Sequence, residues 1–114
     1  MVNFASVRKL ALSFEGTIET PHFEKIAFKV KNKIFITLNK EHHRACVKLS
    51  AIDQSVFCSY DPLIIYPVPN AWGKQGWTLI NLKKVPKEMF MDALTTAYCH
   101  VAPVKLAEKH RNKL

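Results

Sequence analysis

Lysine and arginine side chains gather in two segments of the sequence, where almost no carboxylate opposes them. Residues 25–48 contain one acid, Glu41, and seven cations: Lys25, Lys29, Lys31, Lys33, Lys40, Arg44 and Lys48. Residues 73–87 contain no acid and four cations: Lys74, Lys83, Lys84 and Lys87. Each cation beside a phosphate releases a condensed counterion, so a surface of one sign attracts polyanions. This pattern favours a nucleic-acid-binding surface.

Protection of a sheet edge and attraction to a membrane are two further roles that lysines can have. Lysines often protect a sheet edge from aggregation, which accounts for single lysines but not for the near absence of acids across both segments. A membrane surface is another polyanion, but it is expected to bind a basic amphipathic helix or a polybasic run. Because these cations fall on expected strands and loops, we expect no membrane partner.

The segment 72–77, Trp-Gly-Lys-Gln-Gly-Trp, offers aromatic rings and a cation together. Its glycines permit positive φ and let the backbone approach a partner, and tryptophans stack on bases in single-strand sites. Trp77 alternates with Leu79 and is interpreted as a core residue, whereas Trp72 fits core packing and base stacking equally well. The predicted nucleic-acid-binding residues are Lys29, Lys31, Lys33, Lys40, Arg44, Lys48, Lys74 and Trp72.

Catalytic and metal-binding motifs are not found in the sequence. It has no Walker loop, dinucleotide fingerprint or nucleophile elbow, and its acids form no recognisable pair. His42 and His43 would point in opposite directions in an extended chain, and no C-x-x-C spacing is present. We therefore expect a protein that is not an enzyme and that has no metal or cofactor.

The composition is that of one ordinary soluble domain. The chain has 114 residues, 48% of them hydrophobic and 23% charged, with a formal net charge of +8. Its three cysteines are widely spaced and odd in number, which favours reduced thiols in the cytoplasm over a secreted disulfide framework. We expect a single domain over residues 1–114 with no signal peptide and no membrane span.

The hydrophobic periods predict the elements that must carry these side chains. A helical period covers residues 2–14 and ends near Gly16. A period of two predicts strands over 26–31 and 34–38, turning at Asn32, and a third strand over 45–49. Lys29, Lys31, Lys33 and Lys48 then project from the face or the tips opposite the core.

Helices and strands alternate in the second half of the chain. Ser50 and Asp53 resemble a capping box that opens a short helix, with Ile52, Val56, Phe57 and Tyr60 facing inward. Residues 63–68 are an edge strand or irregular, 77–82 form a strand, and a long helix runs from Pro86 to Pro103. A basic tail follows, with Lys105, Lys109, Arg111 and Lys113. This order predicts an α+β fold with helices packed on one face of an antiparallel sheet.

An ordered set of short segments resembles the MmcQ/YjbR-like family. The segments that carry the resemblance are Glu15–Thr17, Glu19–Phe23, Ala27–Val30, Lys33–Phe35, Lys48–Ser50, Gly73–Trp77, Ala97–Tyr98 and Val101–Ala102, within residues 3–106. The resemblance implies a frataxin-like (CyaY-like) fold, a "double-wing" arrangement and DNA binding. It would make the Lys29–Lys33 hairpin one wing and the Gly73–Gly76 loop a candidate for the other. Gln75 departs from the family, which commonly has Arg or Lys at this position, and the missing cation weakens the expectation that the loop binds phosphate.

The frataxin-like fold also suggests iron binding through an acidic first helix. Here the helix predicted over residues 2–14 contains Arg8 and Lys9 and no acid. Hard cations need clustered carboxylates, so iron binding is not expected.

The sequence thus predicts a small, non-enzymatic DNA-binding protein. Lysine contacts to phosphate position a protein but discriminate little between bases, so sequence-specific binding is not expected. The alternative is an interaction module for an acidic protein or a small anionic ligand, which a basic sheet face would also suit. An enzyme is the third hypothesis.

Overall fold

The helical period near the start of the chain forms α1, Phe4–Ser13, in the computed structural model, which describes residues 2–111. The Oδ1 atom of Asn3 accepts a hydrogen bond from the Ser6 N–H at 2.8 Å and caps this helix. Gly16 then adopts φ +80°, a conformation that favours glycine, and the chain turns into the sheet. The first predicted helix is therefore confirmed.

The predicted hairpin is also confirmed. β2, Lys25–Val30, and β3, Lys33–Asn39, run antiparallel and are joined by Lys31 and Asn32, which both have positive φ. Such a pair of left-handed residues is typical of the two-residue turns whose twist matches that of the flanking strands. β4, Arg44–Lys48, pairs with β3 and is the third predicted strand.

One strand has no counterpart among the predicted elements. β1, Thr17–His22, pairs antiparallel with β2 and forms one edge of the sheet. Apart from Pro21, Ile18 is its one apolar residue, which is why the period of two does not reveal this strand. Proline is tolerated there because an edge strand has no further neighbour that needs its N–H.

The helix after Ser50 begins where the capping box predicts. The Oγ atom of Ser50 accepts a hydrogen bond from the Asp53 N–H at 3.1 Å, and α2 covers Ala51–Cys58. The following apolar residues form only the short edge strand β5, Ile65–Pro67, and one turn of helix, α3, Ala71–Lys74.

The expected inward orientation of α2 is correct for Phe57 and wrong for Ile52, Val56 and Tyr60. Ile52, Val56 and Tyr60 were expected in the core, but their side chains are 77%, 62% and 48% exposed. Phe57, which was also expected to face inward, is partly buried against the core, as is Cys58. The helix therefore lies at the margin of the core and turns most of its apolar residues outward.

The C-terminal region contains two helices instead of one helix and a tail. α4, Lys87–Val101, begins one residue after Pro86, and Pro103 separates it from α5, Val104–Arg111. Ala107 of α5 is buried. The expectation of a basic tail is therefore wrong for residues 104–111, and Lys113 lies outside the described residues.

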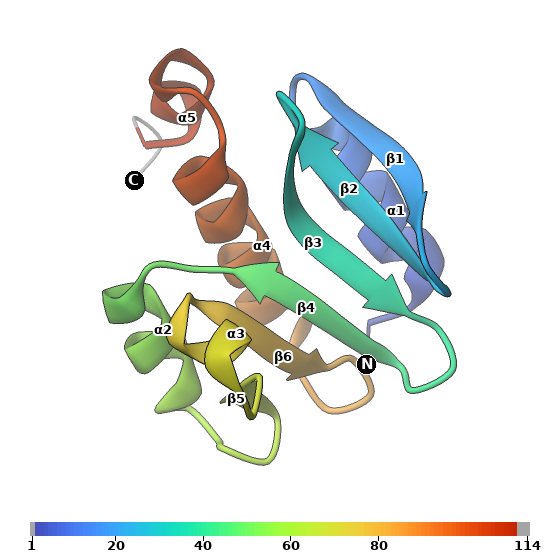
Figure 1. Ribbon diagram of the computed structural model, residues 1–114, viewed down its shortest axis with the longest axis vertical. Helices are drawn as coiled ribbons and strands as arrows, with labels where there is room; N and C mark the ends of the chain where they lie inside the picture. The colour runs from blue at the N-terminus through green and yellow to red at the C-terminus, as the bar shows by residue number, and fades with distance from the viewer. Residues whose placement is uncertain (1, 112–114) are drawn as a thin grey trace.

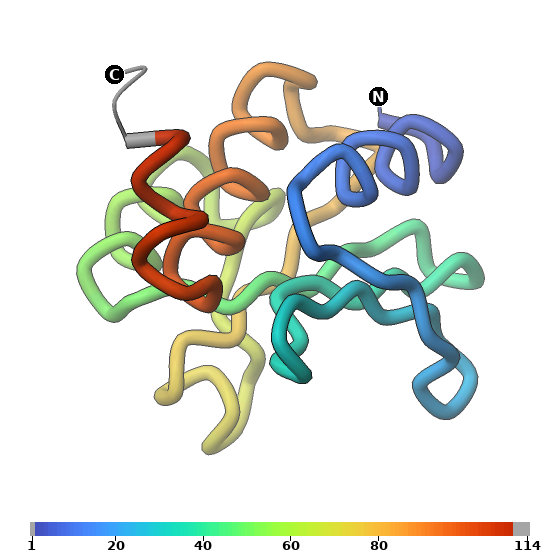
Figure 2. The backbone as a smooth tube through the Cα atoms, turned by 90° about the horizontal axis from the view of Figure 1, so that it is seen from above, coloured from blue at the N-terminus to red at the C-terminus, as the bar shows by residue number. Residues whose placement is uncertain are grey.

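The strands form one antiparallel sheet in the order β1-β2-β3-β4-β6-β5, in which β6, Trp77–Asn81, pairs with both β4 and β5. In Figures 1 and 2 the helices α1, α4 and α5 lie on one side of this sheet. The architecture is the predicted α+β fold. Within residues 2–111, the structure contains no helix with the length and apolar character needed to span a membrane.

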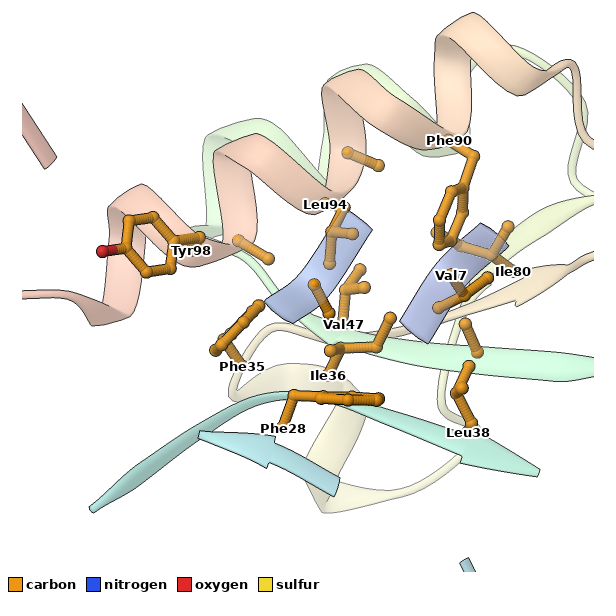
Figure 3. Packing of buried hydrophobic residues seen from close by; sticks show 14 of the residues in the cluster. Val7, Phe28, Phe35, Ile36, Leu38, Val47, Ile80, Phe90, Leu94 and Tyr98 are labelled. Atoms are coloured by element: carbon orange, nitrogen blue, oxygen red, sulfur yellow. The ribbon is translucent and has the colours of Figure 1, made fainter. Parts of the chain in front are cut away.

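The core fills the space between the sheet and its helices. Figure 3 shows Phe28, Ile36 and Leu38 of the sheet pointing toward Phe90 and Leu94 of α4. All five side chains are at most 1% exposed. Because this apolar layer occupies one face of the sheet, the other face is left for a different role.

An aromatic cluster closes one end of this core. The Tyr98 ring stacks on Phe14, with 4.6 Å between ring centroids, and its hydroxyl donates a hydrogen bond to the Glu15 carbonyl at 2.6 Å. The His110 ring of α5 meets Phe14 edge to face, and Lys109 of α5 forms an ion pair with Glu15 at 2.7 Å. These contacts explain why the basic C-terminal segment folds as a helix.

Candidate functional site

The face of the sheet opposite the helices carries side chains of a different kind. The register pairs Lys48 with Trp77 and Cys46 with Leu79 across β4 and β6, whereas Val47 between them is buried. Since side chains alternate between the two faces of a sheet, these four lie on the face away from the helices. We call this surface the open face.

A cleft of about 730 Å³ is hollowed into the open face, and its floor is formed by Ile34, Thr37, Cys46 and Trp77. One wall is the β1–β2 hairpin and the other is the β5–α3 segment. Figure 2 shows both segments extending from the sheet on the side away from the helices. The volume falls within the range of small-molecule sites.

The two walls bring aromatic side chains to the cleft. The wall residues that line it are His22, Phe23 and Lys25 from the hairpin and Val68, Asn70 and Trp72 from the β5–α3 segment. Phe23 is 93% exposed and Trp72 is 58% exposed. Large apolar side chains that remain exposed around a concavity are typical of binding surfaces.

Two glycines allow close backbone approach in the β5–α3 wall: Gly73 lies against Val68 within the wall, and Gly76 lies against Leu49 in the rest of the fold. A Cβ atom on Gly73 would lie 2.0 Å from the Val68 carbonyl oxygen, and one on Gly76 would lie 1.9 Å from the Leu49 carbonyl oxygen. We expected these glycines to bring the backbone to a partner. The structure uses them for close approach of the chain to itself, and the Gly73–Gly76 segment is the end of α3 and a tight turn.

The side chain of Gln54 adds a second attachment of this wall. Its Nε2 atom lies 2.9 Å from the Gly73 carbonyl oxygen, 3.3 Å from that of Trp77 and 3.1 Å from Thr78 Oγ1. The side-chain amide of Gln54, on α2, therefore links α3 to β6. Trp72, which α3 carries, is thereby positioned by contacts from several parts of the chain.

The prediction that Trp77 is a core residue is wrong. Its side chain is half-buried on the open face, where the Lys48 Nζ atom lies 5.8 Å from the ring centroid. Lys48 also donates a hydrogen bond to the Gln75 carbonyl. The period of two placed Trp77 in a strand, but it could not decide which face of the sheet is buried.

The predicted binding residues do not converge on one point. Lys29, Arg44 and Lys48 lie on the open face by their register, Lys31 lies in the β2–β3 turn, and Lys33 directly follows it. Lys40 lies in the β3–β4 turn at the other end of β3, which as a seven-residue strand is about 20 Å long. Lys74 follows Trp72 and Gly73 on α3. The eight residues thus form an extended set around the open face.

In the part of the chain that the structure describes, none of these cations is neutralised by a carboxylate. The ion pairs among residues 2–111 join Arg8 to Glu19 and Lys109 to Glu15, and neither contains a predicted binding residue. The buried Nε atom of Arg44 has no hydrogen-bond partner among the same residues. The charge of this surface is therefore available to an anionic partner.

Sequence reasoning missed the hairpin wall. His22, Phe23 and Lys25 line the cleft, yet none of them was among the predicted binding residues. The relevant signal is weak: Ile18, Thr20 and His22 alternate, but a polar, proline-containing edge strand resembles a loop in sequence.

The floor of the cleft contains no reactive nucleophile. Burial raises the pKa of the Cys46 thiol to about 11, so the thiol stays protonated at neutral pH and is a poor nucleophile. Within residues 2–111 no three His, Cys, Asp or Glu side chains are grouped so that they could hold a metal ion. The lining groups are suited to stacking, apolar contact and hydrogen bonding.

The fold and this site define a small α+β domain with a basic, aromatic-lined open face. The chain belongs to the YjbR family, whose model matches residues 12–100. The resemblance seen in the sequence is confirmed by this match. No curated protein matches the chain.

A solved structure shows the same fold. The crystal structure of the Deinococcus radiodurans protein DR2400, which carries a DUF419 domain, is similar to this chain with a TM-score of 0.78 and 22% sequence identity. The match covers 89% of this chain and 79% of that chain. At this identity the likeness establishes the architecture alone.

Proposed function

We propose that this YjbR-family protein is a small cytoplasmic DNA-binding protein without catalytic activity that contacts mainly the phosphate backbone. The lysine-rich β2–β3 hairpin and Lys74 of α3 supply the contacts. The observation that carries the proposal is that the cations around the open face have no carboxylate partners within residues 2–111. In a chain of net charge +8, such a surface attracts a polyanion over a long range.

The spread of these cations suits an extended anion. Duplex DNA carries one charge per ~1.7 Å of its axis, so a strand length of about 20 Å faces on the order of ten phosphates. Lysine contacts to phosphates fix position and carry little sequence information. The protein is therefore expected to bind different sequences with similar affinity.

The test is fluorescence anisotropy of a labelled duplex of ~20 base pairs, titrated between about 50 and 200 mM salt. The variant Lys29→Gln, Lys31→Gln, Lys33→Gln should weaken binding to all sequences equally and reduce the log–log salt slope by about 0.9 for each lost phosphate contact. The matched control changes Lys9, Lys87 and Lys105 to Gln, because these three exposed lysines lie on the helices of the other side. If both variants unfold at the same urea concentration as the wild type, the substitutions have not affected folding.

A second candidate is an interaction module for an acidic protein or a small anionic ligand. The cleft favours it, since its volume suits a small ligand and none of the described residues lining it is acidic. An unlabelled acidic polypeptide, added as a competitor in the anisotropy assay, distinguishes this candidate from DNA binding. Displacement of the duplex by the polypeptide at equal charge concentration would favour the alternative, and no duplex binding at the lowest salt would overturn the DNA proposal.

A further inference from the structure

We infer that the cleft of the open face binds the bases of an unpaired nucleic-acid strand, so that the protein prefers single-stranded nucleic acid to a duplex. The inference rests on the proposed function, because the cations around the cleft must first hold the phosphates. It goes beyond phosphate contact, since it assigns the cleft to the bases.

Three aromatic rings from separate parts of the chain line the cleft. Phe23 comes from the β1–β2 turn, Trp72 from α3 and Trp77 from β6. The rings of Phe23 and Trp72 are largely exposed and come from different walls, the β1–β2 hairpin and the β5–α3 segment. Single-strand sites combine aromatic platforms of this kind with a positively charged groove, because every base has a π-face on which to stack.

The floor between these rings is neutral and largely apolar. Ile34 and the protonated thiol of Cys46 offer apolar contact to a stacked base. Thr37 on the floor and Asn70 on the wall add hydrogen-bonding groups for a base edge. A base in a duplex presents neither its faces nor its pairing edge, so only an unpaired base can use this surface.

Cations stand where the phosphates of such a strand would run. Lys25 lines the cleft beside Phe23, and Lys29 pairs in register with Ile34 of the floor. Lys74 lies two residues after Trp72 on the opposite wall. Each wall thus offers an aromatic ring and a lysine together, which matches the alternation of base and phosphate along a single strand.

The tryptophans provide a direct readout. Trp72 and Trp77 are the two tryptophans of the sequence, and both line the cleft. Intrinsic fluorescence therefore reports on this site.

Three probes of equal length and labelling separate the contribution of bases to binding from that of phosphates: a thymidine oligonucleotide, an abasic strand with the same phosphates, and a duplex. We expect strong quenching and the tightest binding with the thymidine oligonucleotide, and weaker binding without quenching by the other two.

The variant Trp72→Ala tests the ring itself. Loss of one stacking platform should weaken binding of the thymidine oligonucleotide about 5- to 150-fold and leave duplex and abasic binding nearly unchanged. The matched control is Tyr60→Ala, an exposed aromatic that follows α2 and does not line the cleft, and it should change none of the three. Both side chains are exposed, so both variants should fold.

The outcomes separate this inference from the proposed function. Equal affinity and equal quenching for the thymidine and abasic strands would overturn base binding while phosphate binding stands. Base binding would also be overturned if the variant lacking Lys29, Lys31 and Lys33 lost binding to all three probes while Trp72→Ala had no selective effect on the thymidine oligonucleotide. Phosphate binding would again stand. Absence of binding to every probe at low salt would overturn the proposed function and this inference together.

Discussion

The two walls of the cleft are held by different kinds of contact, although each presents one exposed aromatic ring. The β5–α3 wall contacts the rest of the fold through Gly76, which lies against Leu49, and through the side-chain amide of Gln54, which donates to the Gly73 carbonyl. The β1–β2 hairpin is held by backbone ladders, between its own two strands and between β2 and β3 of the sheet. Phe23 at its turn has φ +58° and meets the neighbouring His22 ring.

Two exposed aromatic rings in one cleft can therefore differ in how strongly their replacement affects the stability of the fold. Trp72 sits on a platform whose position depends on several distant residues, so a change to the platform changes stability and binding together. Phe23 sits on a locally paired hairpin, so a change there should affect binding alone. Stability and binding measured on the same variants can therefore show whether the two walls differ in this way.

The largest effect is expected at Gly76. The variant Gly76→Ala would place a methyl group 1.9 Å from the Leu49 carbonyl oxygen and force φ +103° on alanine. Strain and overpacking together should lower the free energy of unfolding by about 3–5 kcal/mol, measured by urea denaturation. Gly16→Ala is the control, because its φ is also positive but its Cβ atom would meet side chains at ordinary distances, the nearest at 3.5 Å. Equal losses in both variants would show that close approach to Leu49 is not what holds this wall.

A smaller loss is expected when Gln54 is replaced. Gln54→Ala removes the donor that serves the carbonyls of Gly73 and Trp77, which should lower the free energy of unfolding by about 1–3 kcal/mol. It should also weaken single-strand binding, because Trp72 loses its fixed position. The control Gln75→Ala changes an exposed side chain next to α3 and should cost no more than about 0.5 kcal/mol. An unchanged urea midpoint for Gln54→Ala would mean that the Gln54 amide does not stabilise this wall.

The same difference explains which parts of the site could be predicted from the sequence. Local signals predicted the hairpin at Asn32, the capping box at Ser50 and the cluster of lysines around the open face. The facing of α2 and of Trp77 depends on which surfaces other segments cover, and no local period contains that information. The β1–β2 wall was missed because an edge strand can be polar and contain Pro21 without loss of pairing.

The floor between the walls should respond to pH. Burial raises the pKa of Cys46 from 9.0 to about 11, so folding favours the neutral thiol. Below pH 9 the thiol is neutral in both the folded and the unfolded protein. As the pH rises from 9 toward 11 the unfolded protein loses this proton first, so the free energy of unfolding falls by at most about 1.4 kcal/mol per pH unit. Urea midpoints of the wild type and of Cys46→Val, measured from pH 8 to 10.5, should diverge above pH 9, with the wild type falling faster. Parallel curves would mean that water reaches the floor.

The smallest effect on stability is expected at the turn of the hairpin wall. Phe23 is 93% exposed, so Phe23→Ala should change the free energy of unfolding by less than about 0.5 kcal/mol. Phe23→Gly should be neutral or slightly stabilising, because glycine adopts the positive φ of this residue without steric cost. Both variants should nevertheless weaken binding of the thymidine oligonucleotide, measured by tryptophan quenching, since each removes one ring from the cleft. A loss of stability above about 1 kcal/mol in Phe23→Ala would show that the ring itself secures the hairpin, and the contrast between the two walls would then fail.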